Sequence, residues 1–98
     1  MSADWFLGVP YNIASYSMML CLFAKLTGMV ARNFVHMFGD YHIYENHRDQ
    51  LLTQMEQPIK PLPRLEILDI DNINDITFEH FVVHDYQHGP KLGGKVAI

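Results

Sequence analysis

The most informative part of the sequence is Ser2-Ala3-Asp4-Trp5-Phe6-Leu7-Gly8-Val9-Pro10-Tyr11-Asn12-Ile13-Ala14-Ser15-Tyr16. It places a carboxylate at Asp4, a glycine turn at Gly8 and an amide at Asn12 ahead of an apolar segment. An ionised aspartate only accepts hydrogen bonds, whereas an asparagine amide both donates and accepts them. A glycine before Val9-Pro10 permits a turn that leaves backbone N–H and C=O groups open to a ligand. The pattern suits the edge of a heterocyclic ring that carries a carbonyl beside an N–H.

A purely structural interpretation of the same residues is that Asn12 caps a helix and Asp4 caps a turn. The helix is predicted over Ile13 to Thr27, because this run lacks internal glycine and proline and is followed by Gly28. It is apolar nearly all round, so we expect it to be buried on most sides. A chain of 98 residues can hardly cover such a helix alone. The sequence therefore predicts a larger parent protein or a partner subunit.

Composition limits the possible classes of protein. The chain is long enough for one domain, and 49% hydrophobic residues indicate a folded protein. The net charge is −4 and there is no basic run, which argues against nucleic-acid binding. The single cysteine, Cys21, fits a reducing compartment, and we expect it to be a small buried hydrophobe. With no signal peptide and no apolar run long enough to span a bilayer, we expect a cytoplasmic protein without a membrane partner.

The rest of the chain alternates short strands and helices, which is an α+β order. The predicted elements are a strand at Phe34–Phe38, a helix from Asn46 to Gln57, an extended connector at Pro58–Pro63, a strand at Leu65–Leu68, a polar turn at Asp69–Asp75, a helical turn at Phe78–Phe81, and a strand at Phe81–Val83. The tail from Gly89 to Ile98 carries no core pattern.

A second informative stretch is Gly39-Asp40-Tyr41-His42-Ile43-Tyr44-Glu45-Asn46-His47. On extended backbone His42 and Tyr44 point to the same side, where an imidazole and a phenol can both hydrogen-bond one hydroxylated ligand. The alternative is a strand end whose polar tips meet water.

The sequence gives little support for a metal site or a nucleophilic serine. His80, His84 and His88 recur every four residues, but this spacing is generic and no metal site is expected. Ser2, Ser15 and Ser17 lack the motif of a nucleophilic serine.

The two stretches resemble the thymidylate synthase family. The family reads R-S-x-D followed by L-G-[LV]-P-[FY]-N-I-A-S-Y, and every letter after the arginine is present here, with Met1 in its place. The second stretch matches G-[GD]-x-H-[IL]-Y-x-N-H, and Val96-Ala97-Ile98 matches the end of the family's C-terminal tail. The resemblance covers residues 1–98 but only the C-terminal part of the family's length. It implies a mixed sheet packed against a long buried helix.

The resemblance also implies site residues. Those for dUMP would be Ser2, Ala3, Asp4, Asn12, His42, Ile43 and Tyr44, and those for folate would be Asp4, Leu7, Gly8 and Ala97. In this scheme Asn12 reads O4 and N3–H of uracil, whereas an aspartate there marks the related cytidylate hydroxymethylases. His42 and Tyr44 hold the deoxyribose hydroxyl, and the tail folds over the folate.

The family methylates dUMP to dTMP with 5,10-methylenetetrahydrofolate, using a cysteine thiolate in an upstream P-C-H motif. This sequence contains no P-C-H, and Cys21 follows Asp4 instead of preceding it. We therefore expect a C-terminal segment of a thymidylate synthase that is inactive alone and needs an N-terminal half or a homodimer partner. The alternatives are a non-catalytic remnant or assembly module, and a fragment of a cytidylate hydroxymethylase.

Overall fold

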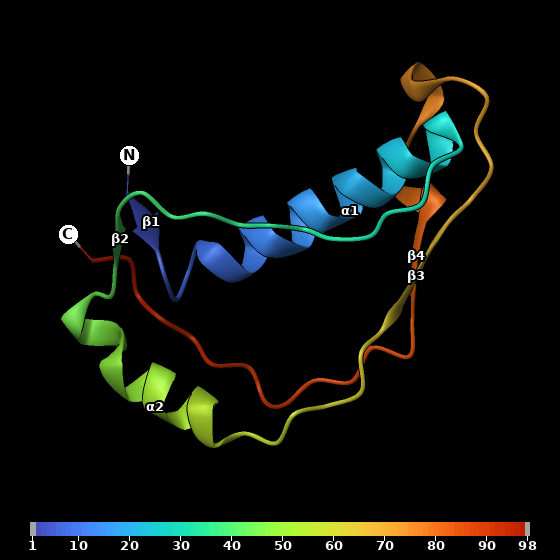
Figure 1. The fold of residues 1–98 in the computed structure, drawn as a ribbon. Helices are drawn as coiled ribbons and strands as arrows, with labels where there is room; N and C mark the ends of the chain where they lie inside the picture. Colours follow the sequence, from blue (N-terminus) through green and yellow to red (C-terminus); the bar gives the residue numbers. More distant parts are fainter. Residues whose placement is uncertain (1, 98) are drawn as a thin grey trace.

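The computed structural model describes residues 2–97 and contains two helices, two small sheets and three short 3-10 turns (Figure 1). In chain order the elements are β1 (Ala3–Asp4), α1 (Val9–Thr27), β2 (Tyr41–His42), a 3-10 turn (Glu45–His47), α2 (Arg48–Glu56), β3 (Arg64–Ile67), 3-10 turns at Ile73–Asp75 and Phe78–His80, and β4 (Phe81–His84). One sheet is a parallel pair of β1 and β2, and the other is an antiparallel pair of β3 and β4. The α+β prediction is confirmed.

Helix α1 begins at Val9, so the prediction of a start at Ile13 is wrong by four residues. Pro10 is tolerated in the first turn because the N–H groups there have no helical partner to lose. The end is as predicted: Gly28 adopts the left-handed conformation with φ of 68°, which costs a glycine little. Asn12 therefore lies inside the helix, and Gly8 occupies the capping position that was considered for Asn12.

The predicted strand at Phe34–Phe38 is wrong, because this segment has no regular secondary structure. It belongs to the connection that returns along α1 to reach β2 (Figure 1). Aromatic contacts hold it instead of a strand ladder: the rings of His36 and Phe38 stack at 4.1 Å, and Phe38 lies 5.3 Å from Trp5. An apolar β-prone run forms a strand only where a neighbouring strand offers its backbone.

The remaining predicted elements are confirmed with small shifts. The second helical region spans the 3-10 turn at Glu45–His47 and α2. β3 pairs with β4 in the register Leu65 to Val83, and the helical turn predicted at Phe78–Phe81 is a 3-10 turn at Phe78–His80 that leads into β4.

The chain leaves much of its surface uncovered. Its accessible surface is 8377 Å², whereas a compact protein of its mass exposes about 5,800 Å². The radius of gyration is 16.2 Å, against about 12.6 Å for a compact domain of this length. Helix α1 buries Val9 and Leu22 but leaves Tyr16 54% and Phe23 48% exposed. The expectation that this chain cannot cover its long helix alone is confirmed.

Candidate functional site

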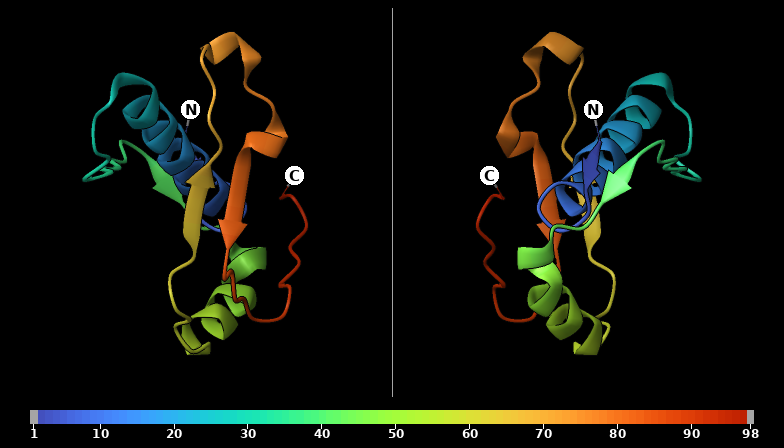
Figure 2. Two further views of the ribbon diagram at one scale, coloured as in Figure 1. Left: turned by 90° about the vertical axis from the view of Figure 1, so that its right-hand side faces the viewer. Right: turned by 90° about the vertical axis from the view of Figure 1, so that its left-hand side faces the viewer.

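The parallel pairing of β1 with β2 brings the two informative stretches side by side (Figure 2). Asp4 lies opposite His42 in this register. The Ala3 N–H donates to the Asp40 carbonyl at 2.9 Å, and the Trp5 N–H donates to the His42 carbonyl at 3.0 Å. Residues that are almost forty positions apart in the sequence therefore share one backbone ladder.

The side chain of Asp4 organises the turn between β1 and α1. Its Oδ1 accepts hydrogen bonds from the Phe6 and Leu7 N–H groups, both at 3.0 Å. Its backbone carbonyl accepts from the Gly8 N–H at 3.0 Å. The turn-capping interpretation of Asp4 is confirmed. Within residues 2–97 the second carboxylate oxygen has no hydrogen-bond partner, so it remains available to a ligand.

An open depression of about 280 Å³ lies beside this ladder. It is lined by three of the predicted dUMP residues, Ser2, Ala3 and Asn12, together with residues 36–40. Asn12 is an exposed residue at the end of the first turn of α1, so its amide is accessible. Residues 36–38 of this lining were not predicted as site residues, because within residues 36–40 only Gly39 and Asp40 stand in a family motif.

His42 and Tyr44 lie against each other outside the lining of that depression. Their ring centroids are 4.4 Å apart with an edge-to-face angle of 70°, so the expectation that they lie on one side is confirmed. The Nε2 atom of His42 is buried and has no hydrogen-bond partner among the described residues. Ile43 between them is 53% exposed. A buried ring nitrogen without a partner is uncommon in a complete site, because its desolvation is unfavourable.

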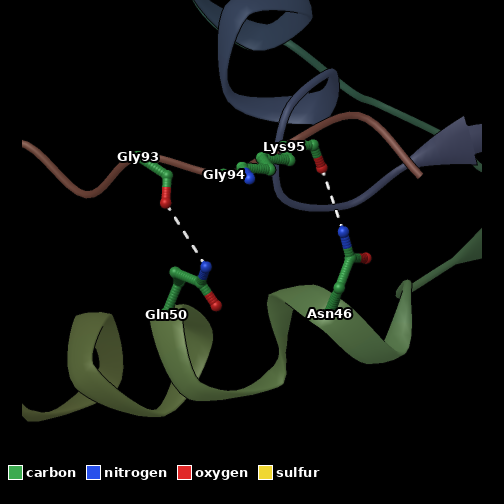
Figure 3. A pocket seen from close by; sticks show the side chains of 5 residues that line it. All are labelled: Asn46, Gln50, Gly93, Gly94 and Lys95. Carbon is green, nitrogen blue, oxygen red and sulfur yellow. Dashed lines mark hydrogen bonds between the residues drawn. The ribbon is translucent and has the colours of Figure 1, made fainter.

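The C-terminal tail lies along α2, where an open depression of about 530 Å³ is lined by Asn46, Gln50 and residues 93–95 (Figure 3). Ala97, the predicted folate contact of the tail, is half-buried two residues beyond Lys95. Leu7 and Gly8 lie in the turn that Asp4 organises. The tail reaches that turn through Phe6, whose ring lies close to Gly94. Met1 and Ile98, which enter the motif comparison, lie outside the described residues.

Two further features are absent from residues 2–97. Within this range, no group of three or more histidine, cysteine, aspartate or glutamate side chains could hold a metal ion. None of the helices in this range combines the length and apolarity needed to cross a bilayer. Cys21 is half-buried within α1.

The chain is similar in sequence and in structure to known thymidylate synthases. The family model described as "Thymidylate synthase" matches residues 1–98. Thymidylate synthase from Mycoplasma pneumoniae is 44% identical over 97 residues, covering 99% of this chain and 34% of that protein. The solved structure of thermostable thymidylate synthase A from Bacillus subtilis superposes with a TM-score of 0.93 at 34% identity, covering 99% of this chain and 35% of that one. The chain thus spans about a third of the length of these relatives, and it belongs to the thymidylate synthase family.

Proposed function

We propose that this chain is the C-terminal segment of a thymidylate synthase domain, which methylates dUMP to dTMP with 5,10-methylenetetrahydrofolate. The observation that carries the proposal is the parallel β1–β2 pair. It sets the Asp4 stretch against the His42 stretch, and both match the family's ligand-binding motifs.

The nucleotide is proposed to bind beside β1. The Ser2 hydroxyl and the backbone of Ala3 and Asp4 contact the phosphate, and Asn12 reads the pyrimidine edge. The amide of Asn12 donates to the O4 carbonyl and accepts from N3–H, whereas a cytosine edge reverses both requirements. The shared depression lined by Ser2, Ala3 and Asn12 supports this arrangement, because one ligand can reach all three.

The sugar is proposed to bind at His42 and Tyr44. A deoxyribose hydroxyl is both a donor and an acceptor, so it can satisfy the buried Nε2 of His42 that has no partner in the described chain. The adjacent Tyr44 ring supports a shared contact with the same hydroxyl. Ile43, which lies between them, completes the proposed dUMP contacts.

The folate is proposed to bind at Asp4, Leu7, Gly8 and Ala97. When bound, 5,10-methylenetetrahydrofolate supplies the one-carbon unit and the reducing equivalents. Asp4 fits this role because one carboxylate oxygen holds the turn while the other is available to a pterin N–H. The tail, which includes Ala97, excludes water from the site when it closes.

The thiolate nucleophile is proposed to come from another part of the fold, since Cys21 is half-buried within α1. The chain exposes about 2,600 Å² more accessible surface than a compact protein of its mass. This excess is far larger than the roughly 800 Å² that one partner buries in a standard interface. An N-terminal portion, and then a second copy in a homodimer, would cover it. The proposed location is the cytoplasm, where an unpaired cysteine stays reduced.

Complementation tests the proposal. This chain is mixed with an N-terminal piece of a relative's thymidylate synthase that carries the nucleophilic cysteine, and tritium release from C5 of labelled dUMP is measured. We expect release from the mixture and none from either piece alone. The matched control replaces this chain by its His42→Ala variant, which should bind the partner piece but lower release.

Three results would contradict the proposal. Release by this chain alone would contradict the absence of the nucleophile. A mixture that forms a complex but releases nothing would favour the non-catalytic remnant. Turnover of dCMP in preference to dUMP would favour a cytidylate hydroxymethylase.

A further inference from the structure

The C-terminal tail is held on α2 and its preceding turn by side chains that the proposed site does not use. Asn46 Nδ2 donates to the Lys95 carbonyl at 3.1 Å, and Gln50 Nε2 donates to the Gly93 carbonyl at 3.3 Å (Figure 3). His47 Nε2 lies 2.7 Å from the same Lys95 oxygen. Because a carbonyl oxygen only accepts, Nε2 must carry the proton and donate it.

His47 is the most deeply enclosed side chain of the described chain, with 0% exposure. Its ring lies 5.0 Å from Phe6 and 5.8 Å from Tyr44. Phe6 follows Asp4 in the turn of the proposed folate site, and Tyr44 belongs to the proposed sugar contact. The histidine that holds the tail therefore also packs against both halves of the proposed site.

Gly94 allows the tail to approach this closely. A Cβ atom at Gly94 would lie 2.8 Å from Phe6 Cε1 and 3.1 Å from two atoms of the His47 ring. A Cβ atom at the neighbouring Gly93 would meet nothing within 4 Å. The requirement for glycine is thus specific to the one position that faces His47.

We propose that His47 is a positioning residue: with Asn46 it fixes the Lys95 carbonyl and thereby places Ala97 at the folate side of the site. The inference rests on the proposed function for the role of Ala97. The docking itself depends only on contacts within this chain, so it can be tested without ligand and without turnover.

Trypsin reports the docking directly, because it must attack the Lys95 carbonyl that His47 and Asn46 hold. Mass spectrometry follows the initial rates of cleavage after Lys95 and after Lys91, the second serving as an internal reference in the same tail. Cleavage of a native protein tracks the population of the open state when opening is fast. The variants are Gly94→Ala, with Gly93→Ala as the matched control, and Asn46→Ala.

We expect Gly94→Ala to raise the ratio of cleavage after Lys95 to cleavage after Lys91 by about tenfold, because overpacking displaces the tail. Asn46→Ala should raise it about threefold through the lost hydrogen bond. Gly93→Ala should leave it within about twofold of the parent, since its added methyl group meets open space. Equal ratios in all four proteins would overturn the inference. So would a uniform rise at every lysine and arginine, which reports general unfolding.

The positioning role is tested in the complemented enzyme with His47→Ala and His47→Gln. A glutamine amide can place a donor near the position of Nε2, so it should restore most of what alanine loses. We expect His47→Ala to raise the KM for 5,10-methylenetetrahydrofolate about tenfold and the Kd for dUMP by a smaller factor, because the ring also packs against Tyr44. Equal losses for both ligands, or no rescue by glutamine, would reduce His47 to a structural residue. If neither variant complements, the trypsin ratio of His47→Ala decides: a rise like that of Asn46→Ala supports the inference, and a ratio equal to that of the parent overturns it.

Discussion

Removal of the Asp4 side chain should loosen the turn from which both proposed sites are built. Asp4→Ala removes the acceptor of two backbone N–H groups, those of Phe6 and Leu7, each at 3.0 Å. Both bonds are part-buried, so the freed N–H groups regain some hydration and each loss costs about 1 kcal/mol. The sum, about 2 kcal/mol, lies at the upper end of the range for alanine replacing a capping residue.

Asp4→Asn is the matched control. The amide oxygen can replace Oδ1 as the acceptor of both bonds, while the negative charge is lost. We therefore expect a loss of less than about 1 kcal/mol in the free energy of unfolding. In the complemented enzyme the same variant should still raise the KM for 5,10-methylenetetrahydrofolate, because the proposed pterin contact loses its carboxylate.

Urea unfolding measures the difference through the fluorescence of Trp5, the single tryptophan of the chain. Trp5 reports on this turn, because its backbone N–H donates to the His42 carbonyl in the β1–β2 ladder and its ring centroid lies 5.4 Å from that of Tyr41. With a slope of about 1 kcal/mol per molar urea, the alanine variant should unfold about 2 M earlier than the parent. Equal midpoints for the alanine and asparagine variants would refute the assignment of Asp4 as the acceptor that holds the turn.

Three further predictions concern other parts of the chain. Asn12→Asp should shift the ratio of kcat/KM values toward dCMP in the complemented enzyme, and an unchanged ratio would contradict the amide argument. Gly28→Ala should lower the free energy of unfolding in urea by about 1 kcal/mol, because φ is 68° at this position. The control is Gly39→Ala, where an added Cβ also meets nothing within 4 Å but φ is not positive; it should lower the free energy of unfolding by less than about 0.5 kcal/mol. Lys25 lies 2.9 Å from Asp69 and holds the pKa of that carboxyl below its ordinary value through a hydrogen bond and its charge, so Lys25→Met should raise the pKa toward that value in an NMR titration. Because the folded-state pKa is lowered, the stability from this pair is present above the unfolded pKa and is lost as pH falls through the folded one, so parent and variant should converge in strong acid.

Elements with a strong local signal could be predicted from the sequence. Gly28 ends α1 because only a residue without a Cβ adopts the left-handed cap at little cost. The helical region that ends before Pro58 and the strands on either side of the 3-10 turns were also found from periodicity and turn residues. The start of α1 was missed because a proline in the first turn of a helix looks the same in sequence as a proline before it.

Elements that depend on contacts between distant residues were not visible in the sequence. The run Phe34–Phe38 has the composition of a strand, but in the described chain it packs through aromatic rings instead. The contact of Gly94 with His47 joins residues that are 47 positions apart, and neither a glycine nor a histidine in the sequence predicts such a contact.

The family and the residue types at the candidate site could be inferred from the sequence, because Asp4, Asn12, His42 and Tyr44 stand in two long motif matches. Their arrangement depends on the folded chain: the parallel β1–β2 pair sets Asp4 opposite His42, and the tail is held by His47 and by Gln50 of α2. The physical reason is that helix caps and turns depend on residues nearby in the sequence. Strand pairing and tail docking depend instead on hydrogen bonds to backbone groups that are distant in the sequence.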